Sequence, residues 1–249
     1  MPGLQPNLSA AERIVCAIDT SKESTAESLV GLAKNAGAWV VKEGLELQSA
    51  TSWKYCSDLA AENDLDWVAD AKIYDIPRTT AGIVNNLAEL DHPPVAITMG
   101  TRAGVDSMKE AQRIAAEAGI MVMGVTLLTS IGEEETKRFE HILPKTVVRR
   151  EVRRATDAGI GGLVCSGLEV KMAKDLAQDR GGLFAMIPGT RSKGADTQDQ
   201  KRSITPQQAI EGGADILVIG SQVTGAEDPA AAYAAVVQEI KQGLQQRAA

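Results

Sequence analysis

The chain has 249 residues, and its formal net charge of −7 argues against a general nucleic-acid-binding surface, although it leaves room for a local basic pocket that binds a small anion. Hydrophobic residues make up 44% of the chain and aromatic residues only 3%, so Val, Ile, Leu and Ala must build the core, as is typical of helices packed around parallel strands. No apolar run approaches the roughly 18 residues of a membrane helix, and the N-terminus lacks the pattern of a secretion signal, so we expect no membrane association.

The cysteine pattern indicates a reducing compartment. Cys16, Cys56 and Cys165 form no CxxC pair, and two of them lie within apolar runs, where a reduced thiol behaves as a small hydrophobic group. We therefore expect a cytoplasmic protein.

Short apolar runs rich in β-branched residues recur along the chain, separated by Ala-, Glu- and Lys-rich segments with helical periodicity. This alternation predicts repeated βα units and a parallel sheet. The predicted strands are Arg13–Ile18, Ala38–Lys42, Asp66–Ala71, Val95–Met99, Ile120–Thr126, Gly162–Cys165, Leu183–Ile187 and Asp215–Ile219. Because eight strands close a barrel, the α/β fold class is predicted to be a single (β/α)8 (TIM) barrel domain over residues 1–249, with residues 1–10 as a loose lead-in, in preference to a doubly wound sheet.

Helix signals separate these runs. The periodicity predicts a helix over Ala103–Glu117 and another over Pro206–Gly212, the latter with Thr205 as N-cap and Pro206 at its first position. Helices between successive strands support the barrel.

The most informative stretch, residues 70–77, reads DAKIYDIP and sets three charged side chains at the end of an apolar run. Side chains two apart on a strand share a face, so we expect Asp70 and Lys72 to project in the same direction, with Asp75 on the loop beyond. Burying such an ion pair usually costs more desolvation free energy than it returns, which favours a functional role. A structural salt bridge at the strand end stays open as the alternative.

Active sites of such barrels lie at the C-terminal ends of the strands, and these ends are unusually polar here. The polar residues at or just after the first, second, third and fifth predicted strands are Asp19, Lys42, Asp70, Lys72, Thr129 and Ser130. Pro188–Arg191 follows the seventh strand and Gly220–Gln222 the eighth, where such barrels bind phosphate.

Lys72 is the best available proton donor, because flanking carboxylates would keep its ammonium group charged and oriented. We expect no metal site, since His92 and His141 fall in predicted linking or helical segments at the surface, without ligand-like partners nearby. A nucleophilic serine is disfavoured, since Ser130 and Ser166 have no evident base.

Taken in order, these motifs resemble the orotidine 5'-monophosphate decarboxylase family. The family signature Asp-x-Lys-x-x-Asp-Ile-Pro with a nearby threonine matches residues 70–77 and Thr79. Further matches are Asp19, Lys42 before Gly44, Leu128-Thr129-Ser130, Pro188-Gly189-Thr190-Arg191, Asp199-Gln200-Lys201-Arg202 and Thr205-Pro206.

The resemblance implies a cofactor-free decarboxylation of orotidine 5'-monophosphate to uridine 5'-monophosphate (UMP), the last step of de novo UMP synthesis. It implies a charged catalytic tetrad of Lys42, Asp70, Lys72 and Asp75. Asp70 would lie against the substrate carboxylate, and Lys72 would stabilise the carbanion at carbon 6 and protonate it.

The substrate-binding residues that the resemblance implies are Asp19, Ile76, Thr79, Thr129, Ser130, Pro188, Arg191, Gln200, Gly220 and Ser221. Asp19, with Lys42, would hold ribose hydroxyls, Thr129 or Ser130 the pyrimidine edge, and Arg191 with the Gly220 amide the phosphate. Gln200 would bridge phosphate and base. In a homodimer, Asp75 and Thr79 would reach into the neighbouring subunit's site.

Two positions depart from the family pattern. Ser221 stands where the family usually has a phosphate-binding arginine, and Met99-Gly100 replaces a polar His-Ala pair. A charge-assisted hydrogen bond is worth roughly 1.5–3 kcal/mol, so the missing arginine is expected to weaken transition-state binding roughly 10- to 100-fold unless Arg191 or Lys193 compensates. Because the proton-transfer groups are intact, we expect an active enzyme with altered phosphate binding.

Two rival interpretations remain. One is a Mg²⁺-dependent sugar-phosphate decarboxylase or aldolase of the same barrel superfamily, although Lys42 stands where such an enzyme would place a metal-binding carboxylate. The other is a nucleotide-binding relative without turnover, which has little use for a costly buried Asp-Lys-Asp cluster.

Overall fold

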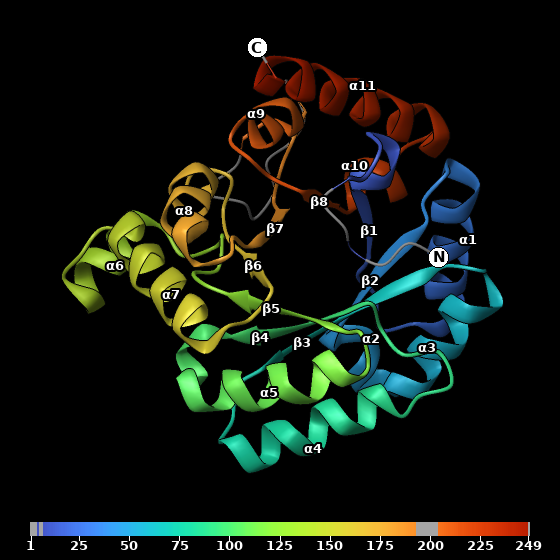
Figure 1. The fold of residues 1–249 in the computed structure, drawn as a ribbon. Helices are drawn as coiled ribbons and strands as arrows, with labels where there is room; N and C mark the ends of the chain where they lie inside the picture. Colours follow the sequence, from blue (N-terminus) through green and yellow to red (C-terminus); the bar gives the residue numbers. More distant parts are fainter. Residues whose placement is uncertain (1–3, 5–6, 193–203, 249) are drawn as a thin grey trace.

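The computed structural model describes residue 4, residues 7–192 and residues 204–248. Eight parallel strands pair in sequence order, and β8 pairs with β1, so they form a closed barrel (Figure 1). The strands are β1 (Ile14–Ile18), β2 (Val40–Gly44), β3 (Asp66–Ile73), β4 (Ala96–Gly100), β5 (Met121–Val125), β6 (Gly162–Val164), β7 (Phe184–Pro188) and β8 (Ile216–Ile219). The predicted TIM-barrel class is confirmed.

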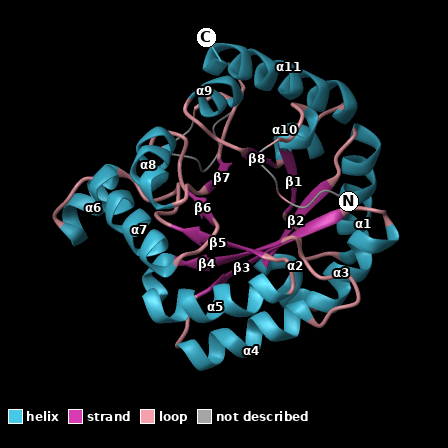
Figure 2. Cartoon of the chain, in the orientation of Figure 1, coloured by secondary structure: helices cyan, strands magenta, loops and turns pink. Residues whose placement is uncertain are grey.

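Helices surround the barrel as an outer layer (Figure 2). They are α1 (Glu23–Ala36), α2 (Leu45–Ala50), α3 (Trp53–Glu62), α4 (Pro77–Ala88), α5 (Val105–Glu117), α6 (Glu133–Glu140), α7 (Pro144–Ala158), α8 (Val170–Ala177), α9 (Pro206–Glu211), α10 (Ser221–Thr224) and α11 (Pro229–Ala248), with short 3-10 turns η1 (Ala11–Arg13), η2 (Thr101–Ala103) and η3 (Gln178–Arg180). Helix α11 packs against α9 and α1 and so covers the junction between β8 and β1. Within the described ranges, no helix is long and apolar enough to cross a membrane.

The core has two parts, because successive side chains of a strand point alternately into the barrel and out toward the helices. The outer part lies between strands and helices and includes the fully buried Trp67 and Met108. The strand residues of the inner part are Val15, Ala17, Val40, Val68, Ala96, Met123, Phe184, Met186, Ile216 and Val218. Leu4 and Leu8 join this inner part, so these two residues of the expected loose lead-in are in fact buried.

The predicted strands agree with the observed ones to within about two residues at each end. Strand β1 begins at Ile14 because Arg13 belongs to η1, where its side chain is buried and donates to the Asp215 carbonyl oxygen at 2.7 Å. Strand β3 continues to Ile73, beyond the predicted end at Ala71. The two added residues are Lys72 and Ile73, so Lys72 belongs to the strand and not to the loop after it.

Candidate active site

A cavity of about 620 Å³ opens at the C-terminal ends of the strands. Its walls continue the inward-facing series of the barrel: Asp19, Lys42 and Asp70 each stand two residues beyond an inward-facing apolar residue of β1, β2 or β3. The strand alternation therefore delivers these charged side chains to one place, as the sequence predicted.

The Asp70 carboxylate lies between two ammonium groups. Its Oδ2 atom is 2.9 Å from Lys42 Nζ and 2.9 Å from Lys72 Nζ, and Lys42 Nζ is also 3.5 Å from Asp19 Oδ1. The side chains of Asp70 and Lys42 are only 10% and 12% exposed, whereas that of Lys72 is 40% exposed. Lys72 is thus the cation of this cluster that a molecule in the cavity can reach most easily.

Electrostatics keep this cluster ionised. Burial by itself would raise the pKa of Asp70, but Lys42 and Lys72 outweigh burial and lower it to about 2. Burial by itself would lower the pKa of Lys42, but Asp70 and Asp19 reverse this and raise it above its usual value. At neutral pH the cavity therefore presents a fixed carboxylate with an ammonium group on either side of it.

Simple strand alternation does not explain how Lys72 reaches Asp70. Ala69 of β3 pairs with Ile97 of β4, but the next pair is Ile73 with Met99, so three residues of β3 face a single residue of β4. Within this bulge Lys72 has a φ of 43°, in the left-handed region that residues other than glycine rarely adopt. The predicted proximity of Asp70 and Lys72 is confirmed, but a bulge rather than a regular strand produces it.

Other predicted residues line the cavity rim. Thr129 lies on the loop after β5, Pro188 ends β7 and Arg191 follows it, and Gly220 follows β8 with Ser221 at the start of α10. These five positions come from three separate parts of the chain, and the barrel brings them to the mouth that holds the charged cluster.

The loop after β7 is attached to the helices after β8. The Ser192 backbone N–H donates to Gln222 Oε1 at 3.3 Å, the Gln222 amide donates to Ser192 Oγ, and Ser192 Oγ donates to Glu239. Arg191 also donates its backbone N–H to Ile204 at 3.0 Å. These bonds hold the neighbourhood of Arg191 beside that of Ser221.

A second set of predicted residues lies away from the cavity. Ser130 is exposed, and Asp75, Ile76 and Thr79 lie on the β3–α4 loop and the first turn of α4, outside the cavity lining. Asp75 accepts from the Ile76 backbone N–H at 2.7 Å, and Ile76 is 61% exposed. Gln200 lies outside the described residues.

Two features were missed from the sequence. Thr98 of β4 is 1% exposed and bonds to Asp70, and an apolar wall of Val125, Val164, Met186 and Val218 faces the charged cluster. The same alternation that located Lys42 could have located Thr98, because Thr98 stands two residues beyond the inward-facing Ala96.

On the opposite face of β2 from the cavity, Glu43 is fully buried beside Cys56. Among the described residues, neither of its carboxyl oxygens has a hydrogen-bond partner. Burial raises the pKa of Glu43 to about 8, against smaller opposing effects of Cys56 and Lys42. Glu43 is therefore largely protonated at neutral pH.

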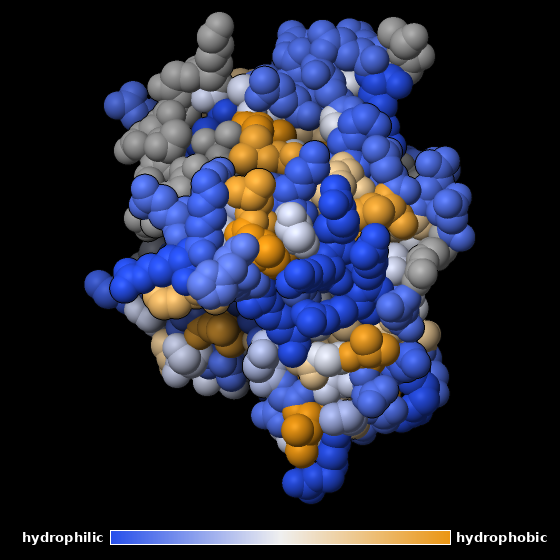
Figure 3. Space-filling view, turned by 90° about the vertical axis from the view of Figure 1, so that its left-hand side faces the viewer, coloured by the Kyte–Doolittle hydropathy of each residue, from blue (hydrophilic) through white to orange (hydrophobic). Residues whose placement is uncertain are grey.

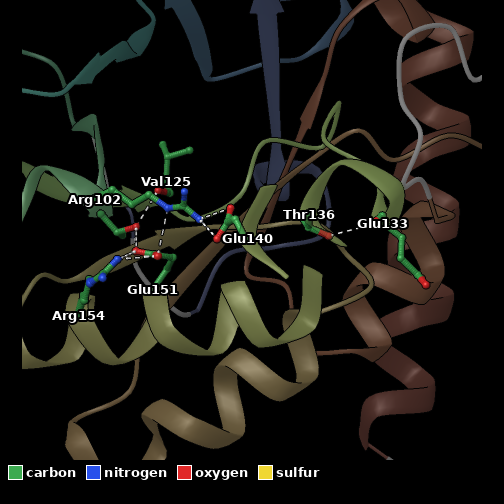
Figure 4. A network of polar contacts seen from close by, with 8 residues as sticks. Arg102, Val125, Glu133, Thr136, Glu140, Glu151 and Arg154 are labelled. Carbon is green, nitrogen blue, oxygen red and sulfur yellow. Dashed lines mark hydrogen bonds and ion pairs between the residues drawn. The ribbon is translucent and has the colours of Figure 1, made fainter. Parts of the chain in front are cut away.

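A polar network joins η2, the turn after β4, to the helices α6 and α7 that follow β5 (Figure 4). Arg102 donates to both oxygens of Glu140, at 2.7 and 2.9 Å, and to Glu151 at 3.3 Å. The 2% exposed Glu151 also accepts from Thr101 at 2.8 Å and from Arg154 at 2.7 Å. The network thus joins the C-terminal end of α6, at Glu140, to η2 and α7.

A second cleft, of about 860 Å³, lies beside α6 on the face shown in Figure 3. That face is largely hydrophilic, with apolar residues in separate groups. Phe139, Leu143 and Leu168, which line the cleft, are exposed. None of the residues that line this cleft belongs to a strand, so it is separate from the cavity at the barrel mouth.

The two histidines differ in their surroundings. His92 is half-buried, with its Nε2 atom 2.8 Å from the Leu65 carbonyl oxygen, so it is only partly a surface residue, whereas His141 is exposed as expected. In the described part of the chain, no three His, Cys, Asp or Glu side chains are grouped as metal ligands would be.

Comparison with known proteins gives a consistent result. A model of the "Orotidine 5'-phosphate decarboxylase / HUMPS family" matches residues 12–236. The orotidine 5'-phosphate decarboxylase of Bradyrhizobium sp. (strain ORS 278) is 34% identical over 236 residues, covering 94% of this chain and 93% of that protein. That of Thermosynechococcus vestitus is 35% identical over 226 residues, covering 90% and 93%.

Among solved structures, the orotidine 5'-phosphate decarboxylase from Lactobacillus acidophilus superposes with a TM-score of 0.75 and 26% identity, covering 92% of this chain and 99% of that one. The similarity thus spans the whole barrel, including every strand that contributes to the cavity. The chain belongs to the orotidine 5'-phosphate decarboxylase / HUMPS family.

Proposed function

We propose that this protein decarboxylates orotidine 5'-monophosphate to UMP without a cofactor, and that Lys72 delivers the proton that replaces the carboxylate. Family membership supports the reaction. The observation that carries the proposed mechanism is the Asp70 carboxylate, whose Oδ2 atom is shared by Lys42 and Lys72 at the wall of the cavity.

In the proposed reaction, the bond between carbon 6 and the carboxylate breaks, carbon dioxide leaves, and the electron pair stays on carbon 6. The Lys72 ammonium group lies beside this developing charge, stabilises it and transfers a proton to carbon 6. Lysine then regains a proton from water. The ionised Asp70 disfavours the substrate carboxylate next to it and holds the Lys72 ammonium group in place.

The remaining rim residues are proposed to bind the substrate. Asp19 and Lys42 bind ribose hydroxyls, and Arg191 with the Gly220 amide binds the phosphate. Of the two residues considered for the pyrimidine edge, Thr129 is favoured, because it lines the cavity whereas Ser130 does not. A role for Gln200 at phosphate and base stays a prediction.

We further propose a homodimer in which Asp75 and Thr79 enter the partner's site. Their position outside the cavity of their own chain supports this assignment, since both would otherwise have no contact with the substrate. Tyr74 and Ile76 on the same loop are 66% and 61% exposed, which is costly for large side chains unless a second subunit covers them. A cytoplasmic location is proposed from the three buried cysteines, none of which forms a disulfide in the described part of the chain.

The proposed function is tested by adding purified protein to orotidine 5'-monophosphate in the presence of EDTA. We expect the substrate's ultraviolet absorbance to fall at the same rate with and without the chelator, and UMP to accumulate in equal amount. Activity that disappears with EDTA and returns with Mg²⁺ would favour the sugar-phosphate type of chemistry instead. Binding of UMP without any turnover would identify a non-catalytic relative.

The phosphate site offers a prediction of its own. Ser221→Arg is expected to tighten UMP binding by roughly 10- to 100-fold, because a charge-assisted hydrogen bond is worth roughly 1.5–3 kcal/mol. Titration calorimetry at low and high salt measures this, and the gain should shrink at high salt. Ser24→Arg, at an exposed position of α1, adds the same charge elsewhere and should leave the affinity unchanged. Equal affinities of both variants would contradict the assignment of phosphate to this rim.

A further inference from the structure

Thr98 occupies the point where β4 faces the bulge of β3. It is 1% exposed, lines the cavity, and is the single residue between Ile97 and Met99, which mark the two ends of the bulge in the β3–β4 pairing. Its side chain is therefore the group of β4 that fills the space opposite Asp70 and Lys72.

The Thr98 hydroxyl makes two hydrogen bonds, one to each of these residues. Its Oγ1 atom donates to Asp70 Oδ1 at 2.8 Å and accepts from the Lys72 backbone N–H at 3.0 Å. Because a hydroxyl carries one proton, the donated bond fixes the other as accepted, and both roles are used. Asp70 in turn receives Thr98 at Oδ1 and both lysines at Oδ2.

The two hydrogen bonds have different effects on the site. The bulge removes Lys72 from regular pairing with β4, and the hydroxyl gives its part-buried backbone N–H an acceptor. The left-handed conformation of Lys72, with φ of 43°, is unfavourable for a lysine and persists only where its surroundings enforce it. The bond to Oδ1 restricts rotation of the Asp70 carboxylate, so that Oδ2 stays toward the two ammonium groups.

We infer that Thr98 is a positioning residue for the proposed decarboxylation: one hydroxyl sets both the orientation of the Asp70 carboxylate and the backbone conformation that aims Lys72 at it. The inference rests on the proposed function. Thr98 acts through these two residues, and its loss misplaces the proton donor without removing any charge from the cavity. A side chain that only filled space opposite the bulge would have no use for its hydroxyl.

The test compares Thr98→Val, which keeps the shape and removes the hydroxyl, with Thr98→Ser, which keeps the hydroxyl. We expect the valine variant to lower kcat by roughly 100-fold, the loss typical of a misplacement of about 1 Å. Its dissociation constant for UMP should stay close to that of the unchanged protein, and the serine variant should recover most of kcat. Thr98→Ala replaces the valine variant if that protein does not fold.

Thr101→Val is the matched control. Thr101 is also a buried threonine whose hydroxyl donates to a carboxylate at 2.8 Å, that of Glu151, but it does not line the cavity. We expect this variant to lose stability and keep kcat. If Thr98→Val keeps kcat, if both valine variants lose it equally, or if serine fails to restore it, the inference is overturned. An unchanged protein that does not decarboxylate the substrate at all overturns the proposed function, and this inference with it.

Discussion

Replacing Lys72 with alanine is expected to lower kcat by at least roughly 10³-fold, because the variant loses both the proton donor and the cation beside the developing carbanion. UMP should still bind, since Lys42, Asp19 and the rim residues remain in place. The measurement pairs steady-state decarboxylation, followed by ultraviolet absorbance, with calorimetric titration of UMP.

Lys54→Ala provides the control for this experiment. Lys54 lies on the surface, where its ammonium group pairs with Asp58 at 2.8 Å and its side chain is 66% exposed, so its loss removes one positive charge far from the cavity. We expect full activity from this variant. A Lys72→Ala protein that still turned over substrate at the rate of the control would contradict the assignment of Lys72 as proton donor.

Glu43→Gln is expected to be more stable than the unchanged protein, by a margin that grows as the pH rises. The pKa of Glu43 is about 8 in the folded protein, above its ordinary value of 4.5, so the folded state holds a proton that the unfolded chain releases. The folded state is therefore destabilised progressively as the pH rises from about 4.5 to about 8. The loss is of the order of 3 kcal/mol between pH 5 and pH 8, and it ends above the folded pKa.

Urea unfolding at pH 5 and pH 8 measures this effect. Because glutamine cannot ionise, the variant and the unchanged protein should differ little in free energy of unfolding at pH 5 and strongly at pH 8. Glu110→Gln serves as the control, because Glu110 belongs to a surface ion pair with Arg113. This variant should still lose stability between pH 5 and pH 8, as the unchanged protein does. If the stabilities of Glu43→Gln and the unchanged protein stay parallel across this pH range, Glu43 does not retain its proton in the folded state.

The barrel and the main charged residues were predictable because both depend on short-range pattern. The strands alternate, so Asp19, Lys42 and Asp70 face inward whatever the neighbouring strands contain. Positions at the ends of parallel strands meet at one edge, which brought Thr129, Arg191 and Gly220 to the same mouth from distant parts of the sequence.

Other features depend on contacts between helices, strands and loops, which a local sequence pattern does not predict. Whether Thr129 or Ser130 faces the cavity depends on how the loop after β5 packs, and only Thr129 does so. Leu4 and Leu8 are buried because the barrel interior accepts them, although their own segment shows no regular period. The left-handed backbone of Lys72 depends on the β3–β4 register, since the bulge exists only relative to its neighbouring strand.

The sequence by itself determined the fold class and the chemistry available at the barrel mouth: period-two apolar runs specify strands, and the order of Asp70, Lys72 and their matching motifs specifies the family. The tertiary structure alone decided how these groups are held, through the bulge in β3, the Thr98 hydroxyl and the burial of Glu43 without a partner. The physical reason is that side-chain direction along a strand follows from the backbone of that strand, whereas hydrogen-bond partners and desolvation are set by what the neighbouring elements place around it.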